Sequence, residues 1–161
     1  MSESVENKEE AGEKEKVQIK RILVPIDGSS NSMRAAKYAI EVAKLQKAQL
    51  LCIHVIANLP YGYEYAGSAI EPYLDDIKNQ SQSWFNQINK MAEDSGIKDI
   101  KTDSLMNILS ITEAIINYAT GNSIDLIVIG TKGRTGLQRF LLGSVASGVS
   151  EHAHCPVLLV R

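Results

Sequence analysis

Glycines and basic side chains gather between residues 130 and 144, in a pattern that suits the binding of an anion. Four glycines stand in this stretch, at Gly130, Gly133, Gly136 and Gly143. Lys132 and Arg134 lie among them, and we expect a helix to begin near Ser144. Backbone N–H groups can come close to a phosphate where no Cβ intervenes, and the first turn of a helix adds unpaired amides. The pattern predicts a loop that cradles a polyphosphate.

The loop follows a strand that we expect to be buried on both faces. Residues 126–129 form an apolar run rich in β-branched side chains, which is typical of a parallel sheet. Turn formation alone would explain one or two of the glycines. The spacing is neither that of a Walker A loop nor Gly-x-Gly-x-x-Gly, so it matches neither of these phosphate motifs.

The spacing does resemble another nucleotide signature. Gly130-x-x-Gly133, nine residues and then Gly143-Ser144 closely resembles the motif of the universal stress protein (UspA-like) family, in its ATP-binding branch. The surrounding residues agree: DLIVIGTKGRTGL begins at Asp125, and HCPVLLVR closes the chain. The resemblance starts with RILVPIDGS at Arg21 and covers nearly everything after it.

Bulk properties limit the classes of protein to consider. The chain has 161 residues, enough for one domain, and a formal net charge of −2, which argues against a nucleic-acid binder that works through a basic face. No apolar run approaches the length of a membrane span, and the N-terminus lacks a signal-peptide hydrophobic region. The two cysteines, Cys52 and Cys155, make no disulfide framework. We expect a soluble, cytoplasmic protein.

The first 16 residues differ from the rest. They hold six glutamates and three lysines and almost nothing apolar, so we expect a disordered acidic extension. A plain solvated extension and an interaction arm are both open interpretations. The expected universal stress protein domain is therefore 17–161.

The chain then alternates between strand and helix patterns. Residues 22–26 predict a first strand, Ala36, Ile40 and Ala43 mark an amphipathic helix, and residues 50–56 predict a second strand. Strand, helix and strand within this length predict a right-handed βαβ unit. The loop 58–68 carries three tyrosines, one of which could stack on a base, although a mobile surface loop is the plainer interpretation.

A long helix should begin near Pro72 and end at Gly96, its left-handed C′ residue. Seven of its residues recur at alternating spacings of four and three, which predicts one seam packed against the sheet. They are Ile70, Leu74, Ile77, Ser81, Trp84, Ile88 and Met91.

The second half of the chain predicts the remaining elements. Residues 100–106 alternate in polarity, which is typical of an edge strand. Ser110 and Glu113 form a capping box for a third helix that ends at Gly121. The family tends to have Gly and Pro at Leu109 and Ile111, so this chain departs from it there. A helix over 144–152 and a strand over 157–160 complete the pattern.

Five strands alternating with four helices predict an α/β domain with a doubly wound parallel sheet and helices on both faces. The resemblance implies the strand order 3-2-1-4-5 of adenine nucleotide alpha hydrolase-like proteins. In that order the first and fourth strands are neighbours at the switch point, where such sheets bind ligands. Asp27 follows the first strand and Gly130 the fourth, so both belong to that crevice.

The resemblance also implies the site residue by residue. Pro25, Ile26 and Asp27 would line the adenosine end, away from the γ-phosphate. Val55 would meet the adenine through its backbone, and Met106, at the end of the third strand, is a further expected contact. The residues implied around the phosphates are Gly130, Lys132, Gly133, Arg134, Gly143, Ser144 and Val145. For Asp27 a helix cap is the alternative role.

Catalytic and metal-binding residues are not predicted. Asp125 lies on the fourth strand but roughly 16 Å from Gly130, at 3.3 Å per residue. The spacing of His152, His154 and Cys155 fits no standard metal site, and packing at a helix end explains them better. His54 and Cys52 lie in an apolar strand and are expected to be core. Mg²⁺ would be carried mainly by the phosphates.

The function that follows is an ATP-binding, nucleotide-dependent regulator or stress-response factor, with at most slow ATP hydrolysis. One alternative is an ATP-hydrolysing or nucleotidyl-transferring enzyme of a related fold, but Asp27-Gly-Ser-Ser-Asn-Ser does not supply the Ser-Gly-Gly-x-Asp-Ser loop of that class. Another is an interaction module with an empty crevice, against which the glycine loop argues. We expect a homodimer through the apolar strand 157–160, and an unidentified protein partner is possible.

Overall fold

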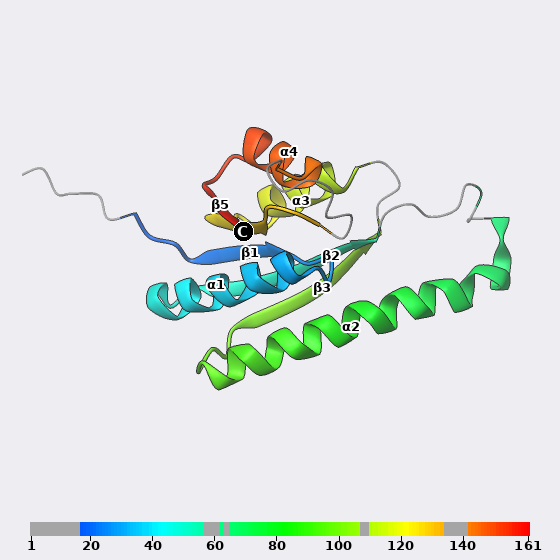
Figure 1. The fold of residues 1–161 in the computed structure, drawn as a ribbon, viewed down its shortest axis with the longest axis horizontal. Coiled ribbons are helices and arrows are strands. Elements are labelled where there is room, and N and C mark those ends of the chain that lie inside the picture. Colours follow the sequence, from blue (N-terminus) through cyan, green and yellow to red (C-terminus); the bar gives the residue numbers. More distant parts are fainter. Residues whose placement is uncertain (1–16, 57–61, 63–64, 107–109, 134–141) are drawn as a thin grey trace, which may run out of the picture.

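The computed structural model describes residues 17–56, 62, 65–106, 110–133 and 142–161. Within them the chain forms one parallel sheet flanked by helices (Figure 1). The strands are β1 Arg21–Pro25, β2 Gln49–Ile56, β3 Ile100–Met106, β4 Leu126–Gly130 and β5 Val157–Val160. The helices are α1 Ser30–Gln46, the 3₁₀ turn η2 Gly67–Ile70, α2 Glu71–Asp94, α3 Ile111–Gly121 and α4 Ser144–His152. No described helix is long and apolar enough to span a membrane.

The strand order is β3-β2-β1-β4-β5, and every described pair is parallel. This confirms the predicted doubly wound sheet, with the polar strand β3 at one edge and β5 at the other. Helices α1 and α2 lie on one face and α3 and α4 on the other (Figure 1). The first two connections wind away from β1 in one direction and the later ones in the other, so the switch point falls between β1 and β4.

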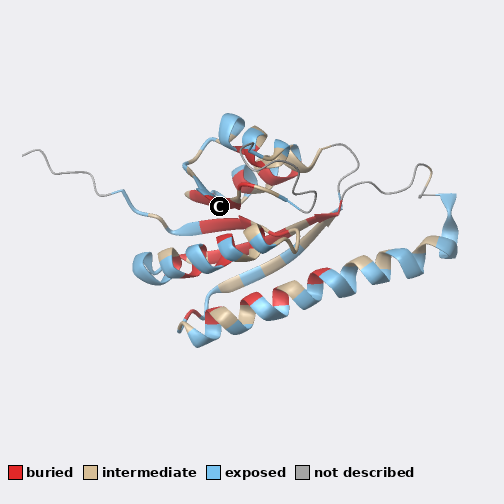
Figure 2. Ribbon diagram, viewed as in Figure 1, coloured by how far each residue is buried: buried red, intermediate tan, exposed pale blue. Residues whose placement is uncertain are grey.

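The core consists of two apolar layers that share the sheet. Ile22 and Val24 point toward α1 and α2, whereas Leu23 points toward α3 and α4. The residues of β4 from Leu126 to Ile129 are all buried, which confirms the strand predicted to be covered on both faces. Figure 2 shows buried residues along β1, whereas the edge strand β3 is intermediate or exposed. Each such aliphatic side chain contributes about 1.5–3 kcal/mol to folding.

Side-chain caps fix where the helices begin and end. Ser29 Oγ accepts from the N–H of Ser32 at 3.1 Å and caps α1. Ser110 Oγ accepts from the N–H of Glu113 at 3.3 Å and caps α3, as predicted. Gly96 follows α2 with φ +82°, which confirms its left-handed C′ role. The predicted bounds of α4 are also confirmed.

The predicted seam of α2 is wrong over its first half. The buried residues of this helix are Ser81, Phe85, Ile88 and Ala92, while Leu74 and Ile77 are only half-buried. A helix of 24 residues is about 36 Å long, whereas the seven-residue strand β3 is about 23 Å long. The first half of α2 therefore extends past the end of the sheet, where Figure 2 shows it largely exposed. We call residues 71–80 the α2 overhang.

Candidate functional site

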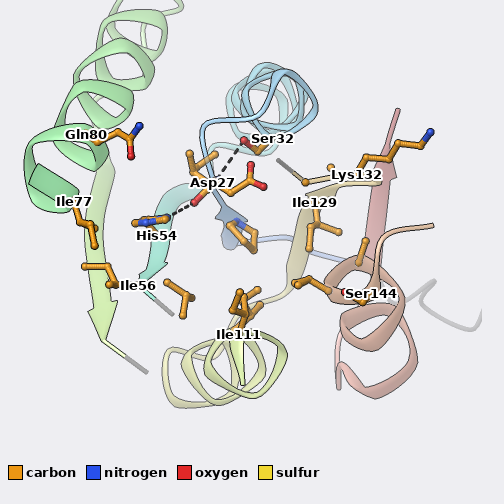
Figure 3. A pocket seen from close by; sticks show the side chains of 18 of the residues that line it. Asp27, Ser32, His54, Ile56, Ile77, Gln80, Ile111, Ile129, Lys132 and Ser144 are labelled. Atoms are coloured by element: carbon orange, nitrogen blue, oxygen red, sulfur yellow. Dashed lines mark hydrogen bonds between the residues drawn. The ribbon is translucent and has the colours of Figure 1, made fainter. Parts of the chain in front are cut away.

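A cavity of about 450 Å³ opens at the carboxyl ends of the central strands (Figure 3). It lies at the switch point between β1 and β4 and extends to the end of β2. Its size falls within the ordinary range for small-molecule sites. Its lining residues are Pro25, Ile26, Asp27, Ser32, His54, Val55, Ile56, Tyr73, Ile77, Gln80, Ile111, Ile115, Ile129, Gly130, Lys132, Gly133, Ser144, Val145 and Ala146.

The ends of the glycine loop are held together beside this cavity. Thr131 N–H donates to the carbonyl of Val160 at 2.8 Å, and Gly143 N–H donates to the carbonyl of Thr131 at 2.7 Å. Ser29 Oγ donates to the carbonyl of Lys132 at 3.4 Å, which ties the loop to the start of α1. Thr131 and Gly143, at the two ends of this loop, are thus hydrogen-bonded to each other.

The first turn of α4 faces the cavity. Its N-cap, Gly143, has φ −61° and no side-chain cap, so the first-turn N–H groups are not satisfied by a capping side chain. Ser144, Val145 and Ala146 line the cavity at this point. The positive end of the helix dipole therefore points toward this space, which favours an anion there. Lys132 lies at the rim of the cavity, and its side chain extends outward (Figure 3).

The described glycines of this loop are needed because neighbouring atoms leave no room for a Cβ. A left-handed backbone conformation is not the reason. Gly130, Gly133 and Gly143 do not have φ in the left-handed region. A Cβ on Gly130 would lie 2.8 Å from the carbonyl carbon of Asn31 and 2.9 Å from the nitrogen of Ser32. Gly130 therefore admits the first turn of α1, a structural role that the sequence pattern did not indicate. A Cβ on Gly133 would lie 2.7 Å from Asp27 Oδ2.

Asp27 holds its own loop and faces the glycine loop. Its Oδ1 accepts from the N–H of Ser29 at 2.9 Å, and its N–H donates to Ser32 Oγ at 3.4 Å. The helix cap proposed as its alternative role belongs to Ser29 instead. Since Oδ2 lies beside Gly133, the carboxylate is closer to the phosphate loop than the adenosine-end assignment implied.

His54 is a lining residue that the sequence interpretation assigned wrongly to the core. It is half-buried, and its ring meets Trp84 edge-on at a centroid distance of 5.1 Å. Its Nδ1 lies 2.8 Å from the carbonyl of Ile26, which can only accept, so Nδ1 carries the proton. The N–H of Ile26 also donates to the carbonyl of Ile53 at 2.7 Å. These two bonds fix the backbone beside Asp27 to the end of β2.

Sequence and structure comparisons identify relatives of this chain. The family model described as "Universal stress protein family" matches residues 18–161. The universal stress protein MJ0531 of Methanocaldococcus jannaschii is 41% identical over 142 residues, which are 88% of this chain and 82% of that protein. The chain belongs to the universal stress protein family. The solved UspA structure from Lactobacillus plantarum superposes with a TM-score of 0.82 at 26% identity, covering 91% of this chain and 100% of that one.

Two solved universal stress proteins of this fold contain adenine nucleotides. One is a complex with cAMP, at 23% identity and a TM-score of 0.65, covering 89% of this chain and 98% of that one. The other, from Archaeoglobus fulgidus, is a complex with dAMP, at 17% identity and a TM-score of 0.65, covering 91% of this chain and 100% of that one. At these identities the likeness shows the shared fold.

Most residues that the family signature singled out come together in this universal stress protein. The predicted residues that line the cavity are Pro25, Ile26, Asp27, Val55, Gly130, Lys132, Gly133, Ser144 and Val145. Gly143 adjoins it as the N-cap of α4. Met106 is 54% exposed and does not line it, because β3 is the edge strand farthest from β4. Arg134 lies outside the described residues.

The lining residues on helices α2 and α3 were missed. Tyr73, Ile77 and Gln80 come from the α2 overhang, and Ile111 and Ile115 come from α3. Apolar residues at this spacing are expected both on a helix face packed in the core and on one that lines a cavity. Periodicity alone therefore does not identify a ligand site. One sequence feature did point to the start of α3. At Ile111 this chain departs from the family, and Ile111 lines the cavity.

The other candidate residues have structural partners. Asp125 Oδ2 accepts from the N–H groups of Lys20 and Arg21 at 2.8 and 2.9 Å, at the opposite end of the sheet. His152 Nδ1 lies 2.9 Å from the carbonyl of Gly148, and His154 Nδ1 lies 3.2 Å from Thr120 Oγ1. Among the described residues no group of three metal-ligating side chains occurs.

Proposed function

We propose that this universal stress protein binds ATP in the cavity and acts as a nucleotide-dependent regulator. The observation that carries the proposal is that one cavity joins an anion-attracting end to an apolar end. The first end contains Lys132, Gly133 and the start of α4. The apolar end contains Ile56, Ile77 and Ile111 (Figure 3). A nucleotide has the same two parts, and relatives of this fold bind cAMP and dAMP.

The lining residues also suit a magnesium nucleotide. Asp27 is the one carboxylate among the described residues of the cavity wall, so it cannot build a metal cage alone. Mg²⁺ usually binds through one or two carboxylates together with substrate phosphates. Asp27 Oδ2, beside Gly133, would be the protein oxygen available to it. The metal would add positive charge that offsets the repulsion between this carboxylate and the phosphates.

Regulation by binding is favoured over rapid turnover. Besides Asp27, the described titratable side chains that line the cavity are His54, Tyr73 and Lys132. Asp27 Oδ1 is occupied by the N–H of Ser29, and Nδ1 of His54 by the carbonyl of Ile26. Slow ATP hydrolysis is the second candidate function, because Asp27 Oδ2 lies on the phosphate side and could orient a water molecule.

We also propose a homodimer through β5. Leu158 and Leu159 are 37% and 38% exposed on a strand at the edge of the sheet. An apolar edge strand offers unpaired backbone groups that proteins usually cover or charge. A second copy, paired about a two-fold axis, would satisfy these groups and cover both leucines.

Replacing Lys132 with alanine tests the phosphate end of the site. A charge-assisted hydrogen bond contributes about 1.5–3 kcal/mol, so the variant should bind ATP about 10- to 150-fold more weakly. Its affinity for adenosine should stay within about twofold. Lys37→Ala removes the same charge from the exposed face of α1 and is the control. Equal losses for ATP and adenosine, or none, would contradict the assignment.

A further inference from the structure

The α2 overhang forms one wall of the cavity. Tyr73, Ile77 and Gln80 are spaced by four and three residues, so they lie on one face of the helix. All three line the cavity although the sheet has ended beneath them. The extra length of α2 therefore has a place in the site that core packing does not explain.

This wall lies at the opposite end of the cavity from the anion-attracting groups. Lys132 and the start of α4 lie at β4, whereas the overhang lies beside the end of β2 (Figure 3). β4 and β2 are separated by β1, which at a strand spacing of about 4.8 Å puts them about 10 Å apart. A ribose separates the base of a nucleotide from its first phosphate. Phosphates at β4 consequently place the base against β2 and the overhang.

Gln80 is the polar side chain that the overhang adds to this apolar end. Figure 3 shows it extending from α2 over the cavity, above His54 and Ile77. It has no hydrogen bond to any described residue. The surrounding walls include Ile56 and Tyr73. The carboxamide is exposed on the cavity side of α2 and is therefore available to a ligand.

We propose that Gln80 makes the site selective for adenine over guanine, an inference that rests on the proposed nucleotide binding. A carboxamide presents a donor and an acceptor side by side. Adenine offers the matching pair, its 6-amino donor beside the ring N7 acceptor, whereas guanine offers two acceptors, O6 and N7, on that edge. Guanine would leave the amide oxygen of Gln80 facing another acceptor. Gln80 is thus a specificity-determining residue, and the isoleucines supply apolar contact to either purine.

Calorimetric titration of ATP and GTP into nucleotide-free protein, wild type and Gln80→Met, tests this role. Methionine keeps the length of the side chain and its suitability for a helix but removes the hydrogen bonds. A bidentate contact of this kind discriminates by about 1–3 kcal/mol, or roughly 5- to 150-fold. We expect ATP affinity to fall by such a factor, GTP affinity to stay within about twofold, and the preference for ATP to disappear. Gln87→Met, on an exposed part of the same helix outside the cavity, should change neither affinity.

The outcomes separate this inference from the proposed function. Wild-type protein that binds neither nucleotide overturns the proposed function. Wild-type protein that binds ATP and GTP equally overturns the role of Gln80 alone. So does a Gln80→Met variant that keeps its preference for ATP, or one that loses both affinities by the same factor. A variant with unchanged melting temperature excludes misfolding as the cause, which is expected because Gln80 is exposed.

Discussion

Replacing Gly130 with alanine should destabilise the fold before it affects a ligand. The added Cβ would lie 2.8 Å from the carbonyl carbon of Asn31, 2.9 Å from the nitrogen of Ser32 and 3.0 Å from the Asn31 oxygen. All three are backbone atoms of the start of α1, and they cannot turn away as a side chain can. Either β4 or α1 must shift. Gly133 differs, since its nearest neighbour is the Asp27 side chain.

The expected magnitude follows from overpacking. Forcing one methyl group into a packed region costs about 1–3 kcal/mol. For a domain of this size each 1 kcal/mol lowers the melting temperature by about 2–4 °C, so Gly130→Ala should melt about 2–12 °C below the wild type. Differential scanning calorimetry measures this difference directly. Gly121→Ala is the control, because a Cβ there would meet no atom within 4 Å and the residue has no positive φ.

A Gly130→Ala variant that melts with the wild type but no longer binds ATP would refute this reasoning. It would mean that the glycine is needed for phosphate approach and that α1 tolerates the methyl group. Gly133→Ala, in contrast to Gly130→Ala, should melt within about 2 °C of the wild type, because the Asp27 carboxylate can rotate away from the added methyl group.

Three further predictions concern stability, assembly and turnover. Burial raises the pKa of Cys52 from 9.0 to about 12, so above pH 9 only the unfolded thiol ionises, and the unfolding free energy should fall by about 1.4 kcal/mol per pH unit. Urea titrations of Cys52→Ala should give a slope smaller by this amount, while Tyr118 and Cys155, whose pKa values burial also raises, still contribute; equal slopes would contradict it. Light scattering should show a wild-type dimer at micromolar concentration and a Leu158→Lys, Leu159→Lys monomer, with Leu45→Lys as the exposed control; a monomeric wild type would exclude the β5 dimer. Steady-state ATP hydrolysis should be far below about 10 s⁻¹ and absent in Asp27→Asn, and a rate near that value would overturn the regulatory role.

The dimer test uses Leu159 rather than Val160 for a structural reason. Val160 is 5% exposed and belongs to the core layer on the α1 side. A lysine there would bury an unpaired charge and unfold the monomer, whatever the state of assembly. Leu158 and Leu159 are exposed, so a lysine at either position should affect dimer formation without unfolding the monomer.

Most of the fold could be predicted from the sequence because local signals agreed with it outside the first half of α2. Strand β4 reads as four consecutive apolar residues, and it is buried on both faces. Ser110 and Gly96 mark a helix start and a helix end by side-chain and backbone chemistry that acts within a few residues. Strand order was different, since it depends on long-range pairing. It came from the family signature, which this chain shares.

The site could be predicted where its residues lie at the carboxyl ends of strands or belong to the glycine motif of the family. Asp27, Gly130 and Lys132 lie at or just after the carboxyl ends of β1 and β4, and the switch point brings such segments together. The α2 overhang escaped prediction because an amphipathic pattern does not show where the sheet beneath it ends. His54 escaped because an imidazole in an apolar strand is indistinguishable, in sequence, from a buried one.

Calorimetric titration of ATP with Mg²⁺ into protein verified to be free of nucleotide tests the central claim most directly. The cavity between β1 and β4 predicts saturable binding of one nucleotide per chain, weakened in Lys132→Ala and retained in Lys37→Ala. Inorganic triphosphate at equal concentration should bind more weakly than ATP, because the apolar end would stay empty. No ATP binding even at millimolar concentration, on folded protein, would contradict the account.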